Sequence, residues 1–170
     1  RGALRSLLSQ DYPADAYEIV VVDNGSTDGT RKVVHDMSAP GVTLRYVYVG
    51  QPGLARARNA GALASRYDIL AYMDDDALAG RDWLTYIAEA FDRLGPSVAA
   101  VGGKATVVWE GGPPNCLPAG FLPYFGGTDQ LGDRPRLLDS HEYPVGTNFS
   151  VRRKALLAID GFNEALTRYN

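Results

Sequence analysis

Three consecutive aspartates, Asp74, Asp75 and Asp76, directly follow the apolar run of residues 69–73. Neighbouring carboxylates repel one another, and a cation placed among them relieves the repulsion. Hard divalent cations take oxygen ligands and often bind through one or two carboxylates while substrate phosphates complete the shell. In an extended segment Asp74 and Asp76 point to the same side, so we expect them to face one ligand together. A solvated acidic turn that caps the next helix is the alternative.

A second carboxylate, Asp23, ends the apolar run of residues 19–22 and opens a polar loop at residues 23–30. Ligands of open parallel sheets bind beyond the carboxyl ends of the strands. Asp23 and the aspartate run are therefore the first candidates for ligand contact. The alternative for Asp23 is a helix cap or an Asx turn, although Asp28 fits the capping position better.

Two arginines lie in residues 53–61 (GLARARNAG), where small residues open a predicted helix and allow close backbone approach. An arginine in such a place can pair with a phosphate or stack on a base. We expect this role for Arg58. For Arg56 we expect a surface salt bridge.

Strands and helices alternate along the sequence and would position these side chains. Apolar runs and alternating patterns predict strands over residues 17–22, 44–49, 69–73, 98–101 and 105–109. Helical spacing of apolar residues predicts helices around residues 4–8, 33–37, 54–65, 83–94 and 154–159. This succession predicts an α/β fold with a mostly parallel central sheet flanked by helices.

Composition narrows the classes of function. The 170 residues fit one domain, and a net charge of -3 with scattered arginines argues against a nucleic-acid surface. The single cysteine, Cys116, excludes an internal disulfide framework. Glycines and prolines make residues 111–143 irregular, which is typical of lids, binding loops or disordered segments. We expect the chain to begin and end inside a domain.

Three segments taken in order resemble family 2 glycosyltransferases of the inverting GT-A type. They are residues 20–30 (VVVDNGSTDGT), 53–61 (GLARARNAG) and 73–77 (MDDDA). The similarity continues through residues 146–153 and 161–164. It implies one partial Rossmann-like GT-A domain over 1–170, divided into a nucleotide-binding portion at 1–109, an irregular acceptor-side loop at 110–145, and an acceptor-side strand and helix at 146–170.

The resemblance also implies a donor, which is a nucleoside-diphosphate sugar and usually a UDP-sugar. Asp23 would contact the base, and Arg58 would lie near the nucleotide. Asp74 and Asp75 would lie near the ribose and the diphosphate. Asp76 would ligate Mn²⁺ or Mg²⁺, with Asp74 as the second candidate ligand, and the metal would offset charge on the leaving diphosphate.

On the acceptor side, the resemblance implies that Gly146, Thr147 and Asn148 line the site and that the acceptor is a glycan or a lipid-linked molecule. It places the general base beyond Asn170, so the catalytic residue is not identified. Asp139, Glu142 and Glu164 are weaker candidates for that base. The resemblance is compatible with a cytoplasmic protein at the inner face of the membrane, attached through regions outside this sequence.

Three other classes of protein share some of these features. A sugar-phosphate nucleotidyltransferase also combines metal-binding aspartates with a nucleotide fold, but it would need a glycine-rich phosphate loop. A non-catalytic domain that binds a nucleotide sugar or glycan would lack the base. A dinucleotide-dependent oxidoreductase is disfavoured because no G-x-G-x-x-G follows a strand.

Overall fold

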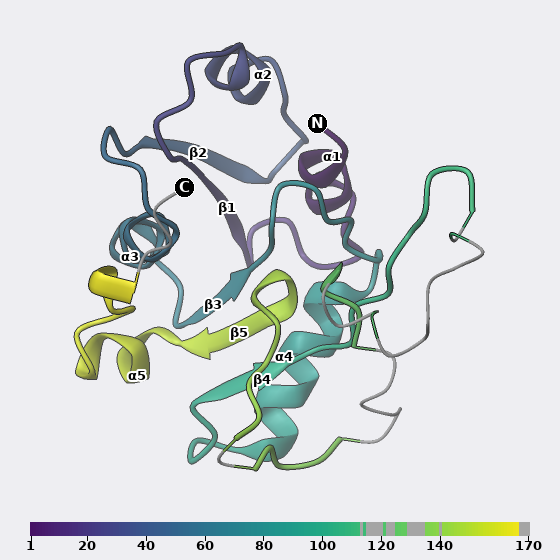
Figure 1. The fold of residues 1–170 in the computed structure, drawn as a ribbon, viewed down its shortest axis with the longest axis vertical. Coiled ribbons are helices and arrows are strands. Elements are labelled where there is room, and N and C mark those ends of the chain that lie inside the picture. The colour runs from purple at the N-terminus through teal and green to yellow at the C-terminus, as the bar shows by residue number, and fades with distance from the viewer. Residues whose placement is uncertain (113, 115–120, 122–124, 129–134, 140, 167–170) are drawn as a thin grey trace.

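The computed structural model describes residues 1–112, 114, 121, 125–128, 135–139 and 141–166 (Figure 1). Cys116 and Asn170 lie outside the described residues, as does much of the irregular stretch. Helices and strands alternate through the first half of the chain. In order, the elements are α1 (Gly2–Leu8), β1 (Glu18–Asp23), α2 (Thr30–His35), β2 (Thr43–Tyr48), α3 (Leu54–Ala64), β3 (Ile69–Tyr72), α4 (Trp83–Leu94), β4 (Ala100–Gly102), η3 (Gly146–Asn148), β5 (Phe149–Arg152), α5 (Arg153–Ala158) and η4 (Glu164–Leu166).

Strands β1 and β2 form a parallel pair, in which Asp23 lies opposite Tyr48. One core cluster joins buried residues of α1, β1 and α2, namely Leu4, Ile19 and Val34. On the opposite side α3 packs on β1, and a side chain at Gly61 would touch Val22. The β1–β2 pair is therefore covered by helices on both sides, which explains its continuous β-branched run.

The second sheet has the order β3–β5–β4, and both of its pairings are antiparallel. The sequence predicts a mostly parallel sheet. Among the described strands, however, only β1 and β2 pair in parallel. The physical reason is that β5 runs back between β3 and β4 after the long irregular stretch, and a chain that reverses direction pairs antiparallel. The core packed against this second sheet contains Ala62 of α3, Leu70, Val151 and Leu156.

Most predicted elements agree with the structure to within two residues. The helix predicted over 83–94 is α4, with Phe91 buried and the Arg152 guanidinium stacked 4.9 Å from its ring centroid. The strand predicted at 105–109 is wrong. Ala105 instead exchanges two hydrogen bonds with Thr128, from its N–H to the Thr128 hydroxyl and from the Thr128 N–H to its carbonyl, so a loop residue takes the place of a strand partner.

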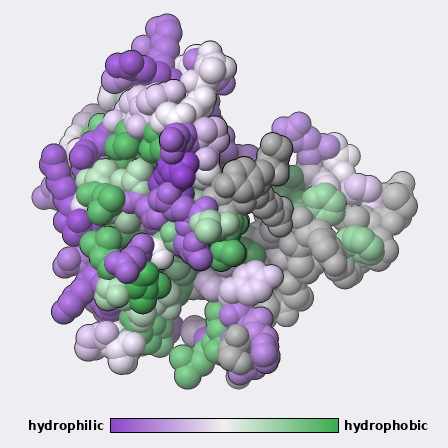
Figure 2. Space-filling view, turned by 60° about the vertical axis from the view of Figure 1, so that its left-hand side comes forward, coloured by the Kyte–Doolittle hydropathy of each residue, from purple (hydrophilic) through white to green (hydrophobic). Residues whose placement is uncertain are grey.

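Hydrophilic and hydrophobic residues are interspersed on the side of the molecule that carries α3, and the end formed by α2 is hydrophilic (Figure 2). Exposed apolar side chains on α3 include Leu54 and Leu63. No helix within the described ranges is both long and apolar enough to cross a membrane.

Candidate functional site

Asp23 is a buried carboxylate whose two oxygens both accept hydrogen bonds from the fold. Asp23 is only 4% exposed. The Ser26 N–H donates to Oδ1 at 2.8 Å, and the Tyr46 hydroxyl donates to Oδ2 at 2.5 Å. Gly25, in the left-handed region at φ 82°, lets the chain turn back so that Ser26 reaches the carboxylate. The Asp23 side chain therefore closes the first turn of the loop that follows β1.

These contacts keep Asp23 in its charged form. Burial by itself would raise the pKa of Asp23, but the hydrogen bonds from Tyr46 and Ser26 outweigh burial and hold this pKa below its usual value. The same hydrogen bond from its hydroxyl to Asp23 raises the pKa of Tyr46. Asp23 is thus a fixed, ionised hydrogen-bond acceptor near neutral pH.

An open pocket of about 500 Å³ lies beside this carboxylate. Asp23 and Tyr48 line it together with Arg31, whose guanidinium carbon is 5.8 Å from the Tyr46 ring centroid. The remaining lining residues are Ser26, Thr27, Asp28 and Tyr46. Aromatic faces, a cation and a hydrogen-bond acceptor are suited to binding a flat heteroaromatic ring. The oxygen Oδ1 of Asp28 accepts from the Thr30 N–H, two residues on, and so forms an Asx turn just before α2. The N-cap of α2 is Gly29, so the capping position expected for Asp28 is off by one residue.

The aspartate run forms a turn after β3. The strand ends at Tyr72, and the Ala77 N–H donates to the Asp74 carbonyl at 3.2 Å. The extended geometry expected for Asp74 and Asp76 is therefore wrong, because Asp75 and Asp76 occupy the two central positions of a β-turn. Alternation along a strand no longer places Asp74 and Asp76 on one side. Asp75 and Asp76 are exposed, and the Asp74 side chain is 46% exposed.

The chain that follows this turn is anchored to α1 and the residues after it. The Ser6 hydroxyl accepts from the Ala79 N–H at 3.0 Å. The Asp11 N–H donates to the Arg81 carbonyl at 2.8 Å, and the two side chains form an exposed ion pair. Contacts with the N-terminal segment thus fix the turn from its far end.

Arg58 of α3 lies beside this turn. Its Nη2 is 3.7 Å from Oδ1 of Asp74, and its side chain is 19% exposed. The guanidinium carbon is 5.9 Å from the Tyr72 ring centroid and 5.7 Å from that of Phe162. Burial raises the pKa of Tyr72 to about 12, despite the opposing charge of Arg58. Arg58 makes no side-chain hydrogen bond to another described residue, so its N–H groups are free for a ligand.

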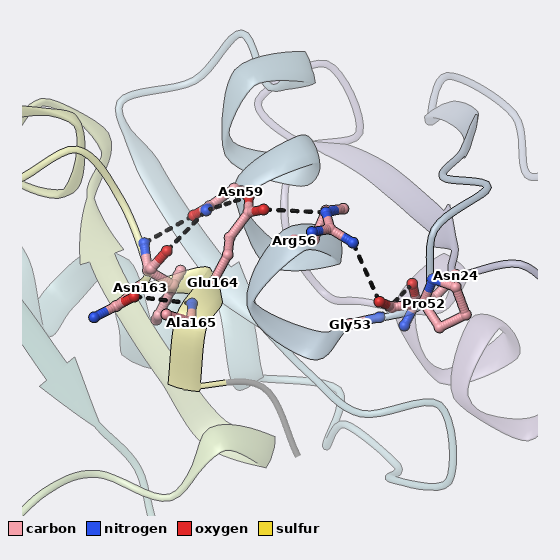
Figure 3. A network of polar contacts seen from close by, with 9 residues as sticks. Asn24, Pro52, Gly53, Arg56, Asn59, Asn163, Glu164 and Ala165 are labelled. Atoms are coloured by element: carbon pink, nitrogen blue, oxygen red, sulfur yellow. Dashed lines mark hydrogen bonds and ion pairs between the residues drawn. The ribbon is translucent and has the colours of Figure 1, made fainter. Parts of the chain in front are cut away.

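Arg56 has the structural role that its sequence position suggested. Its Nε donates to Glu164 at 3.0 Å, and its Nη1 donates to the Pro52 carbonyl at 3.3 Å (Figure 3). Next to Pro52, the Gly53 N–H donates to the Asn24 side chain at 3.1 Å. These contacts connect the C-terminal segment, the start of α3 and the loop that carries Asp23.

The three residues expected on the acceptor side lie in η3, next to the donor-side candidates. Gly146 adjoins Arg58, because a Cβ built on it would lie 2.3 Å from Nη2 of that arginine. Asn148 has a structural role: its Oδ1 accepts from the Trp83 indole N–H, and its Nδ2 donates to the Lys104 carbonyl, both at 2.9 Å. Thr147 is partly buried.

Two of the carboxylates considered as a stand-in base are already paired. Glu142 accepts two hydrogen bonds from Arg136, which hold the pKa of Glu142 at about 2. Glu164 accepts from Arg56 and Asn59. A base must take up a proton near neutral pH, so the lowered pKa disfavours Glu142. Glu164 is disfavoured because its carboxylate already binds two side chains of α3. Asp139 donates its backbone N–H to Glu142, and no described contact brings it to Arg58.

The carboxylates of the aspartate turn offer oxygen donors of the kind that a hard divalent cation prefers. Within the described residues, no group of three or more His, Cys, Asp or Glu side chains forms a complete metal-binding cluster. This donor set fits a cation that takes one or two protein ligands and completes its shell with phosphate oxygens.

Sequence reasoning missed Tyr46 and Phe162. Tyr46 was assigned only to a strand, but parallel pairing puts Val21 opposite it, so Asp23 and Tyr46 share one face of the sheet. That register could have been inferred from the two apolar runs. Phe162 lies far from Arg58 in sequence, and no spacing pattern could connect them.

The relatives found by sequence comparison include named glycosyltransferases. The chain is 26% identical over 160 residues to glucosyl-dolichyl phosphate glucuronosyltransferase of Haloferax volcanii, an alignment that covers 94% of this chain and 50% of that protein. It is 34% identical over 110 residues to glycosyltransferase AglE of the same organism, covering 64% and 36%. The chain therefore spans half or less of the length of these relatives.

Solved structures share the fold. S. aureus TarS 1–349 superposes with a TM-score of 0.73 at 22% identity, covering 98% of this chain and 47% of that one. The mannosyltransferase PcManGT from Pyrobaculum calidifontis superposes with a TM-score of 0.68 at 27% identity, covering 95% and 42%. The expected GT-A fold class is confirmed by these neighbours. Residues 1–158 match the model of glycosyl transferase family 2, and the chain belongs to that family.

Proposed function

We propose that the chain binds a nucleoside-diphosphate sugar, with UDP-sugar as the leading candidate, and transfers the sugar with inversion to a glycan or lipid-linked acceptor. The observation that carries this proposal is the position of Arg58. Its mostly buried guanidinium has no hydrogen bond to a described residue and lies 3.7 Å from the turn that carries the three aspartates. A cation with unused donors beside exposed carboxylates suits a diphosphate that is shared with a metal ion.

Asp23 and its pocket take the nucleotide base in this proposal. An ionised carboxylate only accepts hydrogen bonds, so it selects a base edge that carries an N–H donor. Uracil and guanine both present such a donor at a ring nitrogen. The TarS structures include complexes with UDP and with UDP-GlcNAc, and the PcManGT structure is a complex with GDP-Man and Mn²⁺.

Asp76, with Asp74 or Asp75 beside it, would hold Mn²⁺ or Mg²⁺. When bound, such an ion acts as a Lewis acid toward the leaving diphosphate. Asp74 and Asp75 also lie near the ribose and diphosphate in this proposal. The chain's own cation, Arg58, stabilises the negative charge that builds on the diphosphate as the sugar departs.

The acceptor side is the least defined part of the proposal. Thr147 borders it, in keeping with the proposed division at residues 109 and 145. The general base is assigned to residues beyond Asn170. A cytoplasmic location at the inner face of the membrane, reached through regions outside this sequence, would suit a lipid-linked acceptor.

Calorimetric titration with UDP and GDP, with Mn²⁺ and with EDTA, tests the donor site. We expect binding that requires the metal and that weakens at least about tenfold in Asp76→Ala. Asp92→Ala removes an exposed carboxylate from α4 and is the matched control, with unchanged affinity expected. Metal-independent binding that Asp76→Ala leaves intact would overturn the metal assignment. Absence of nucleotide binding in the unsubstituted chain would overturn the donor site itself.

A further inference from the structure

The Arg58 guanidinium lies in a seat formed by residues from three separate parts of the chain. The rings of Tyr72 and Phe162 lie 5.9 and 5.7 Å from its central carbon, and they pack edge to face at an interplanar angle of 88°. Gly146 adjoins the guanidinium from η3. These contacts limit the positions that a long, flexible side chain could otherwise occupy.

The Arg58 guanidinium leaves no room for a Cβ at position 146. Its φ lies outside the left-handed region, so the backbone there would accept other residues. A Cβ at this position would approach Nη2 of Arg58 to 2.3 Å, which is far inside van der Waals contact. The obstructing atom is the far end of a flexible side chain, so an added methyl group would displace the guanidinium and leave the backbone in place.

Phe162 is fixed through its backbone by Asn59, the residue that follows Arg58 in α3. The Phe162 N–H donates to Oδ1 of Asn59 at 2.8 Å, and Nδ2 of Asn59 donates to the Phe162 carbonyl at 2.9 Å. Figure 3 shows Asn59 on α3 facing the C-terminal segment, with the Glu164 carboxylate between Asn59 and Arg56. Two adjacent residues of α3 therefore contact Phe162: Arg58 contacts the Phe162 ring, and Asn59 binds the Phe162 backbone.

We propose that Gly146 and Phe162 are positioning residues that set where the Arg58 guanidinium meets the donor diphosphate, with Asn59 holding Phe162 in place. This inference rests on the proposed function, because it assumes that Arg58 binds the diphosphate. It also assigns Gly146 to the donor side, in place of the acceptor side that the resemblance implied. Neither Gly146 nor Phe162 needs to touch the nucleotide.

A double-mutant cycle between Gly146→Ala and Arg58→Lys tests the inference on the full chain, with the Kd of UDP or GDP in the presence of Mn²⁺ as the readout. Lysine keeps the charge but lacks the planar fork that would fill the space beside residue 146. Gly146→Ala should weaken binding about tenfold in the parent chain, as expected when charge-assisted hydrogen bonds are misplaced. In the Arg58→Lys background the same change should weaken it less than about twofold.

Gly80→Ala is the matched control, because a Cβ there meets nothing within 4 Å and its φ is outside the left-handed region. It should leave Kd unchanged. Gly146→Ala should leave the Tm within about 1 °C of the parent, a result that a purely structural role would not give. Equal effects of Gly146→Ala in both backgrounds would overturn the inference while the donor site stands. Failure of the parent chain to bind either nucleotide would overturn the proposed function as well.

Phe162 is tested by two substitutions that differ in the ring. Phe162→Tyr keeps an aromatic face for Arg58 and should hold Kd within about threefold of the parent. Phe162→Leu keeps an apolar side chain without the ring and should weaken binding several-fold, with little further loss when combined with Arg58→Lys. Equal affinity of the leucine and tyrosine variants would contradict a positioning role for the ring.

Discussion

Asp23 and the aspartates of the turn after β3 differ in how many hydrogen bonds and ion pairs their carboxylates receive from the protein. Asp23 is 4% exposed, and its oxygens are bonded to Tyr46 and Ser26. Asp75 and Asp76 are exposed at a turn, and within the described part of the chain the Asp74 side chain makes only the ion pair with Arg58 at 3.7 Å. The first site is thus rigid before any ligand arrives, whereas the second has negative charge that a bound cation would balance.

The two arginines of α3 repeat this contrast. Arg56 donates to Glu164 and to the Pro52 carbonyl, so its role is complete within the protein. Arg58, two residues later, stacks on two rings and makes no hydrogen bond to a described residue. Residues two apart on a helix do not share a face, so each arginine meets a different environment.

The largest stability effect is expected at Asp23. Asp23→Ala leaves the Tyr46 hydroxyl and the Ser26 N–H without their acceptor, which costs about 1–3 kcal/mol of the free energy of unfolding. Thermal unfolding should show a Tm lowered by several degrees. Asp28→Ala, in the same loop but exposed, is the control and should lose only about 0.5–1 kcal/mol. Similar losses for the two variants would mean that Asp23 is not part of the rigid site.

A smaller effect, dependent on pH, is expected for Tyr46→Phe. Because the pKa of Asp23 is lowered in the folded state, its ionised form stabilises the fold above the unfolded pKa of about 3.9, and this contribution is lost as the pH falls through the lower folded value. Removing the Tyr46 hydroxyl should raise the folded pKa of Asp23 and reduce the loss of stability below about pH 4. Unfolding measured from pH 7 to 2.5 gives this slope, and parallel curves for the two proteins would contradict the account.

The smallest effect on stability is expected at the aspartate turn. Asp76→Ala and Asp75→Ala remove exposed carboxylates, so the free energy of unfolding should change by less than about 0.5 kcal/mol. Denaturant titration without metal measures this change. A loss above 1 kcal/mol in either variant would show that the turn is a structural element and would weaken its assignment to a ligand.

Local patterns were enough to predict most of the fold. The apolar run before Asp23, the stripe on α4 and the small residues of α3 are local signals, and the elements they predict are present. The antiparallel pairing of β5 between β3 and β4 has no local signal, since it depends on how the chain returns from the irregular stretch. The turn at Asp74 was missed because strand alternation was extended through Asp76, although β3 ends at Tyr72.

The site residues that directly follow a strand could be predicted from the sequence. Asp23 and Asp74 follow that rule, and the structure brings Asp74 to Arg58. The seat of Arg58 was not predictable, because Gly146 and Phe162 lie about 90 and 100 residues away in sequence and reach it only through tertiary packing. Asn148 was grouped with Gly146 by resemblance, yet its amide binds Trp83 and Lys104.

The central claim is that the diphosphate lies at Arg58 and the base lies at Asp23. Titration of Arg58→Met with UDP and with uridine in the presence of Mn²⁺, or with GDP and guanosine if guanine is preferred, tests this division directly. The account predicts that the diphosphate binds about 10- to 100-fold more weakly than to the parent chain, while the Kd of the nucleoside changes less than about twofold. Equal weakening of the nucleoside and its diphosphate, or no weakening of either, would contradict it.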